Sequence, residues 1–149
     1  MSQQTETLLN SVLIKMARSF LQYMSEASPW IGEQAQGIGE QVAVLAVRQR
    51  QDAALIADLL ADREYFVDFG VYPTEYTDQQ FLALEAVFSN LRSSQDQVCD
   101  AISTIHAEVS TAGDTQAADV LGTIDVRQKE LAHALKELQR ELKESGASA

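Results

Sequence analysis

The chain has 149 residues, 46% of them apolar, which fits one ordinary domain with a hydrophobic core of its own. Its net charge of −11 argues against nucleic acid and anionic membranes as partners, because both are bound by clustered lysine and arginine. The single cysteine rules out an intrachain disulfide. No apolar stretch reaches the roughly 20 residues that span a bilayer, and residues 1–6 lack a signal-peptide pattern. We therefore expect a cytoplasmic protein.

The first predicted helix covers residues 5–25. Its apolar residues recur at spacings of three and four, which is the helical signature. The stripe comprises Leu9, Val12, Met16, Phe20 and Tyr23. Ser28 and Pro29 follow as an N-cap and a first helical residue, since proline is tolerated at the start of a helix but not inside it.

The second predicted helix covers residues 40–63, with an apolar stripe that begins at Val42 and ends at Leu60. Glycines make the preceding stretch Gly32–Gly39 ambiguous, and either a loop or a weak helical start fits it. An aromatic-rich segment, residues 65–76, comes next. We expect it to lie over the bundle as a long crossover, because a flexible linker is poor in aromatic residues.

Thr77 and Gln80 form a capping-box pattern that opens the third predicted helix, residues 78–110. Gly113 is a typical helix terminator, and Asp114 can cap the fourth predicted helix, residues 115–143. Each helix has one apolar face that it must bury against the others. The fold class is therefore all-α, an antiparallel four-helix bundle in one domain over residues 1–149.

A weak internal repeat relates the second and fourth helices. Residues 47–51 (VRQRQ) and 126–130 (VRQKE) lie 79 positions apart, and Ala53 and Leu59 recur at the same offset as Ala132 and Leu138. Either a duplication or chance similarity between two amphipathic helices explains the pattern.

Two helical pairs joined by a long crossover resemble the ferritin-like superfamily. The crossover 72–78 (YPTEYTD), the following Leu82-x-Leu84, and the junction Pro29-Trp30 are similar to small bacterial members of it. The resemblance spans most of the chain. It implies the same bundle with the long connection between helices two and three, and it raises the question of a metal site.

In metal-binding members, helices one and three each supply a carboxylate and helices two and four each supply Glu-x-x-His, all pointing inward. Glu130 and His133 form the one literal match. Taking Leu131 as the centre of the apolar stripe, Glu130 lies about 100° away and His133 about 160° away, because a helix turns about 100° per residue. We therefore expect this pair to face solvent and expect no bound metal or other cofactor.

The same helical wheel directs four polar residues inward: Gln49, Asp52, Gln95 and Gln128, with Met16 at the matching position of the first helix. Amides are poor ligands for iron, manganese or zinc. We interpret these residues as a polar layer left where a metal site has been lost. They either pair with one another in the core, since an unpaired buried amide costs about 1–3 kcal/mol, or turn to the helix edge, where water serves them.

Neither His106 nor Cys99 stands at a spacing that makes a nucleophile–base pair. Two functions of different classes remain. The first is a non-catalytic bundle that acts through contacts with a protein partner or with itself, as a homodimer paired through helices one and two, where residues 42–47 are apolar nearly all round. The alternative is a carboxylate-bridged iron or manganese protein, an oxidase or a metal store. Its ligands would be Asp52, Glu130 and His133, with Glu33 or Glu40.

Overall fold

The computed structural model describes residues 3–27, 33–76 and 84–145. Within these ranges the helices are α1 (Gln4–Ala17), α2 (Phe20–Ala27), α3 (Glu33–Asp62), α4 (Leu84–Thr111) and α5 (Thr115–Ser145). Four predicted features lie outside the described residues: the cap at Ser28 and Pro29, the Trp30 junction, the capping box at Thr77 and Gln80, and the start of the third helix at residue 78.

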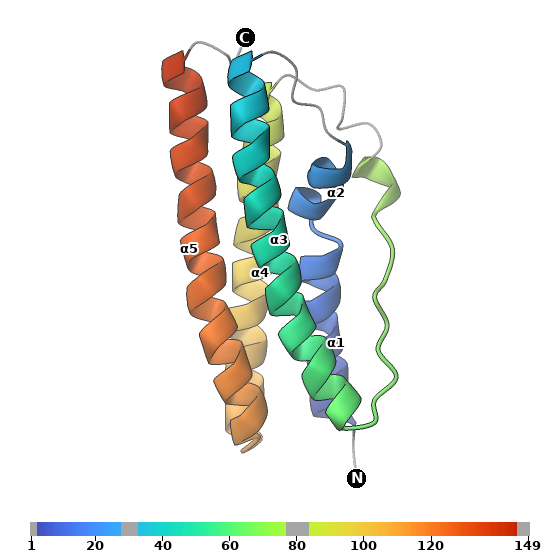
Figure 1. Cartoon of the computed structure of the whole chain (residues 1–149). Helices are drawn as coiled ribbons and strands as arrows, with labels where there is room; N and C mark the ends of the chain where they lie inside the picture. Colours follow the sequence, from blue (N-terminus) through green and yellow to red (C-terminus); the bar gives the residue numbers. More distant parts are fainter. Residues whose placement is uncertain (1–2, 28–32, 77–83, 146–149) are drawn as a thin grey trace.

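The helices form an antiparallel four-helix bundle in which α1 and α2 together make the first member, which confirms the predicted fold class (Figure 1). α1, α2 and α5 run in one direction, while α3 and α4 run in the other. α4 packs against α5, and α3 packs against both α1 and α5. None of the helices in the described part of the chain is both long and apolar enough to cross a membrane.

The predicted first helix, residues 5–25, is wrong in one respect: the structure breaks it between α1 and α2. The Arg18 N–H still donates to the Ile14 carbonyl at 2.9 Å, but the Ser19 hydroxyl then accepts a hydrogen bond from the Gln22 N–H at 3.3 Å. Ser19 thus acts as an N-cap that starts a new helix. The apolar stripe continues from Met16 to Phe20 across the break, so periodicity alone does not reveal it.

The predicted start of the second helix at residue 40 is also wrong, because α3 already begins at Glu33. The ambiguous stretch up to Gly39 is therefore helical over residues 33–39. Each helical glycine costs roughly 1 kcal/mol relative to alanine. Burial of Ile38 in the apolar core offsets part of that cost.

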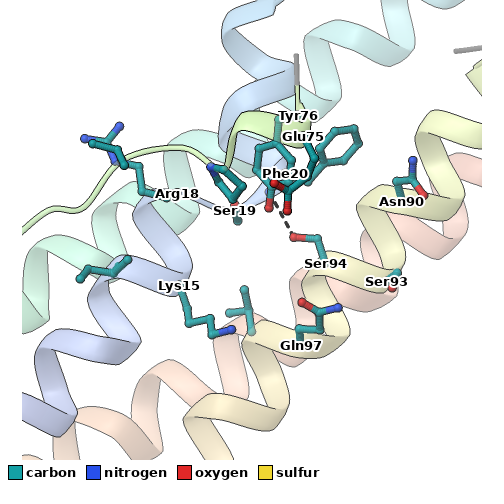
Figure 2. Close-up of a pocket in the computed structure, with 14 residues that line it drawn as sticks. Lys15, Arg18, Ser19, Phe20, Glu75, Tyr76, Asn90, Ser93, Ser94 and Gln97 are labelled. Atoms are coloured by element: carbon teal, nitrogen blue, oxygen red, sulfur yellow. Dashed lines mark hydrogen bonds between the residues drawn. The ribbon is translucent and has the colours of Figure 1, made fainter. Parts of the chain in front are cut away.

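The crossover lies along the outside of α1, as predicted, and is fastened to it by hydrogen bonds (Figure 1). The Asn10 amide donates to the Asp68 carbonyl and accepts from the Asp68 N–H, both at 3.0 Å. Arg18 donates to the Phe69 carbonyl at 3.0 Å. Gly70 has a φ of +67°, and a Cβ at this position would lie 2.8 Å from the Ile14 side chain, so glycine permits the close approach. A cavity opens where α1 gives way to α2 (Figure 2).

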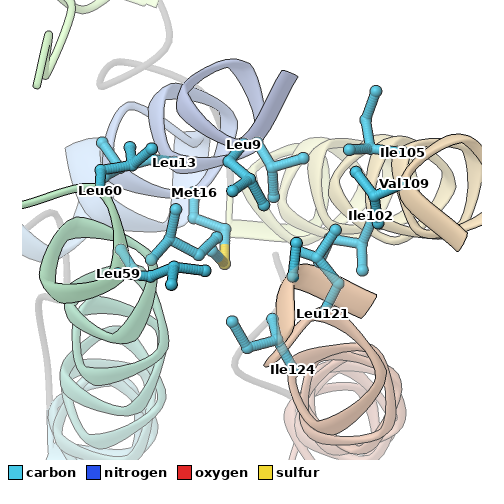
Figure 3. Close-up of a cluster of buried hydrophobic side chains, with 14 of the residues drawn as sticks. Leu9, Leu13, Met16, Leu59, Leu60, Ile102, Ile105, Val109, Leu121 and Ile124 are labelled. Carbon is cyan, nitrogen blue, oxygen red and sulfur yellow. The ribbon is translucent and has the colours of Figure 1, made fainter. Parts of the chain in front are cut away.

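The apolar core consists of two clusters separated along the bundle axis. The first joins α1 to one half of α3, α4 and α5, and Figure 3 shows Leu13, Met16, Leu60 and Ile102 among its members. The second joins α2 to the other half of the same three helices. The buried residues between the two clusters are polar.

The turn between α4 and α5 follows the prediction. Gly113 adopts a φ of +81° after α4 ends. The predicted cap is confirmed, because Asp114 Oδ1 accepts from the Ala117 N–H at 3.1 Å. Both Asp114 carboxylate oxygens also accept from Arg63, at 2.7 and 2.8 Å, and this hydrogen bonding lowers the pKa of Asp114.

Candidate functional site

The candidate site is a layer of hydrogen-bonded polar side chains across the middle of the bundle, between the two apolar clusters. We call it the amide layer; its members are Ser19, Gln22, Gln49, Asp52, Gln95 and Gln128. All six are buried, each with at most 3% of its surface exposed. They come from the α1–α2 junction, α2, α3, α4 and α5, so every member of the bundle contributes to the layer.

Three glutamines form the centre of the layer. Gln49 Nε2 donates to Gln95 Oε1 at 2.9 Å and to Gln128 Oε1 at 3.1 Å. Gln95 Nε2 donates to the same Gln128 oxygen at 3.0 Å, and to the Gln128 backbone carbonyl at 3.0 Å. The structure therefore brings together α3, α4 and α5 through amides that pair with one another inside the core rather than with water at the helix edges.

Asp52 lies at the edge of the layer and is held by two donors from α5. Its Oδ2 accepts from Gln128 Nε2 at 2.8 Å, and its Oδ1 accepts from Arg127 Nε at 2.6 Å. The carboxylate is 2% exposed, whereas the Arg127 side chain is 39% exposed. The ion pair thus compensates the buried charge of Asp52 while the guanidinium reaches the surface.

Ser19 and Gln22 also belong to the layer, although the helical wheel did not indicate them. The Ser19 hydroxyl donates to Gln49 Oε1 at 2.7 Å, and Gln22 Nε2 donates to the same oxygen at 3.0 Å. Gln22 also donates to the Ala46 carbonyl and accepts from Arg50, both at 2.8 Å. A signal was present, because Ser19-x-x-Gln22 has the spacing of a capping box, which marks a helix start.

All the polar side-chain atoms of the amide layer have hydrogen-bond partners. Among the described residues no buried side-chain nitrogen or oxygen lacks a hydrogen-bond partner. Gln95 Oε1 accepts from Gln49. The other two central oxygens each accept from two donors: Gln49 Oε1 from Ser19 and Gln22, and Gln128 Oε1 from Gln49 and Gln95. Such a network fixes the register of the helices and leaves these oxygens little capacity to bind another group.

Glu130 and His133 face away from the bundle centre, and their side chains are 63% and 73% exposed. Glu130 lies 3.8 Å from Arg48, and His133 lies 4.0 Å from Glu137. Glu40 is exposed on α3. Among the described residues, no group of three or more histidine, cysteine, aspartate or glutamate side chains is placed to hold a metal ion.

The two remaining candidates, His106 and Cys99, are on α4, and the Cys99 sulfur accepts from Gln95 Nε2 at 3.9 Å. His106 is half-buried on α4, and its Nε2 would lie 3.5 Å from a Cβ added at Gly122. Cys99 is half-buried on the same helix, and burial raises the pKa of its thiol. A raised pKa keeps the sulfur protonated, which opposes a nucleophilic role.

Comparisons with known proteins agree with this architecture. A family model described as a ferritin-like domain matches residues 6–145. The chain is similar to a solved PmFTN variant soaked in iron, with a TM-score of 0.76 and 12% identity, over 96% of this chain and 90% of that one. It is also similar to an Archaeoglobus fulgidus ferritin engineered into a closed form, with a TM-score of 0.76 and 17% identity, over 100% of this chain and 90% of that one. No curated protein matches the sequence.

Proposed function

The chain belongs to the ferritin-like family, and we propose that it is a member whose bundle centre is structural and whose function is exerted through protein contacts, in the first place with a second copy of itself. The observation that carries this proposal is the amide layer. It occupies the middle of the bundle, and two of its three central oxygens, those of Gln49 and Gln128, each already accept two hydrogen bonds.

The residues at the centre do not fit the di-metal group that the family implies. That group is held by inward carboxylates and Glu-x-x-His pairs from the four helices. Here the inward positions carry Met16, Gln49, Gln95 and Gln128. Asp52, the one buried carboxylate among the described residues, is engaged by Arg127 and Gln128. A neutral amide supplies none of the anionic charge that these metals require.

Exposed apolar side chains support self-association. On α3, Val44 and Val47 point outward while Val42, Leu45 and Ala46 are buried, so this part of the helix is apolar on both sides. The crossover adds Phe66, Phe69 and Val71, of which Phe66 is 94% exposed. Large exposed apolar groups are costly in water and mark contact surfaces when they gather.

Light scattering after size exclusion, over a wide range of protein concentration, tests the self-association. We expect a dimer that a paired change of Val44→Lys and Val47→Lys converts to a monomer. Thr104→Lys adds a lysine at an exposed position on α4 and is the matched control, expected to leave the dimer intact. A wild-type chain that stays monomeric at every concentration would refute the proposal.

A second function has support from the family itself, since one similar structure is described as soaked in iron. In this alternative the protein is an iron or manganese oxidase or store that uses Asp52, Glu130 and His133, with Glu33 or Glu40. It requires Asp52 to exchange Arg127 and Gln128 for a metal, and α5 to turn so that Glu130 and His133 face inward. Anaerobic loading with either metal distinguishes the two functions.

A further inference from the structure

A cavity of about 470 Å³ lies beside the α1–α2 break and is walled by α1, the crossover and α4 (Figure 2). We call it the α1–α4 cavity. Its volume is within the range of small-molecule sites, about 300–1,000 Å³. It borders the amide layer at Ser19, which lines the cavity and also donates to Gln49.

Two opposite charges face the α1–α4 cavity. Figure 2 shows the Lys15 side chain and the Glu75 carboxylate entering it from opposite ends. Within the described part of the chain, neither of them forms an ion pair with another residue. Arg18 also lines the cavity, but its guanidinium is committed to the crossover, where it bonds the Phe69 carbonyl and stacks 4.9 Å from the Tyr72 ring centre.

The wall between the two charges offers polar groups that are already positioned. The Ser94 hydroxyl accepts from the Phe20 N–H at 3.1 Å and is hydrogen-bonded to Tyr76. Gln97 supplies an amide on the α4 side. Apolar groups complete the lining on the α1 and crossover side: Ile14, Val71 and Pro73.

We propose that the α1–α4 cavity binds a small linear zwitterion, a molecule with a carboxylate at one end and an ammonium at the other, joined by a short methylene chain. Lys15 recognises the carboxylate and Glu75 recognises the ammonium. A simple anion would meet the charge of Glu75, and a simple cation would meet that of Lys15, so only a ligand with both charges satisfies both residues. The methylene chain packs against Ile14 and Val71.

Isothermal titration with 6-aminohexanoate tests the proposal, with hexanoate and hexylamine as ligands of the same chain length that each lack one charge. We expect saturable binding of 6-aminohexanoate that is several-fold tighter than that of either control ligand. Glycine carries the same two charges without the methylene chain that packs against Ile14 and Val71, so it should bind more weakly than 6-aminohexanoate.

Variants of the full chain assign the binding to the cavity. Lys15→Gln and Glu75→Gln should each weaken binding by about two- to fivefold, the range for exposed charge pairs. Lys136→Gln removes an exposed charge on α5 outside the cavity and should change nothing. The double change Lys15→Glu with Glu75→Lys should restore binding relative to Lys15→Glu alone, because the zwitterion can then bind in reverse.

Three results would overturn the proposal: no saturable binding at millimolar 6-aminohexanoate, equal affinity for hexanoate or hexylamine, or unchanged affinity in Lys15→Gln and Glu75→Gln. Circular dichroism of each variant shows that the bundle is intact. An unfolded variant is replaced by Gln97→Trp, which fills the cavity from α4 and should also abolish binding.

Discussion

Gln49 Nε2 lies 3.1 Å from Gln128 Oε1, and the two glutamines are equivalent positions in the 79-residue repeat. The same offset relates Met16 to Gln95, which are buried at the middle of the bundle in the first and third members. The two halves of the chain therefore meet through matching residues. The symmetry stops at Asp52, whose equivalent, Leu131, belongs to an apolar cluster.

Replacing the central glutamine of α3 tests the energetic role of the amide layer. Gln49→Leu removes the partner of Ser19, Gln95 and Gln128 and should lower the free energy of unfolding by about 1–3 kcal/mol or more. Gln51→Leu makes the same change at an exposed position of α3 and should have an effect within about 0.5 kcal/mol. Urea unfolding measures both variants, and equal effects would contradict a structural layer.

The Asp52–Arg127 pair allows a double-mutant cycle. Arg127→Met leaves the buried carboxylate with Gln128 as its remaining partner and should destabilise the fold by about 1–3 kcal/mol, less than for a fully buried pair because Arg127 is partly exposed. In an Asp52→Asn background the same change should cost much less. Additive losses in the cycle, measured by urea unfolding, would mean that the two groups are not coupled.

The α5 cap makes stability depend on pH. The pKa of Asp114 is lowered chiefly by hydrogen bonding to Arg63. Its stabilisation is therefore fully present above the ordinary pKa of an aspartate and is lost as the pH falls through the lowered value. At neutral pH Asp114→Ala should cost about 1–2 kcal/mol.

Thermal unfolding at a series of pH values measures that loss. The difference between wild type and Asp114→Ala should shrink as the pH falls through the acid range. Asp119→Ala, an exposed change on the same helix, is the control and should show no such convergence. A constant difference across the acid range would exclude the ion pair as its cause.

Two glycines with positive φ separate backbone strain from steric contact. A Cβ added at Gly113 has no atom within 4 Å, so Gly113→Ala should cost only the backbone strain of a φ of +81°, about 1 kcal/mol of stability. Gly70→Ala bears a similar strain and also places its Cβ 2.8 Å from Ile14. We expect Gly70→Ala to lower the free energy of unfolding more than Gly113→Ala does, and to speed hydrogen exchange at the Asp68 N–H. Equal losses in the two variants, with unchanged exchange, would show that the crossover moves away from α1 without a loss of stability.

Helical periodicity was sufficient to predict the bundle, because the apolar residues of each long helix recur on one face. It also directed Gln49, Gln95 and Gln128 inward, where the structure places them. It could not reveal the break at Ser19, since Met16 and Phe20 keep the same spacing across it. Nor could it reveal the helical start of α3, where the unfavourable helix propensity of glycine is partly offset by burial of Ile38. The partners of Asp52 depend on the rotation of α5 relative to α3, which no single-helix pattern contains.

Elemental mass spectrometry measures whether the bundle centre holds a metal ion. The protein is purified without chelator, loaded anaerobically with iron(II) or manganese(II), and desalted before measurement, with a Glu130→Gln and His133→Ala double variant beside it. We expect far less than one ion per chain, and the same trace in both proteins, because the amide layer occupies the bundle centre. About one or two ions per chain, lost in the double variant, would refute a structural role for the bundle centre and assign the protein to the metal-binding members of its family.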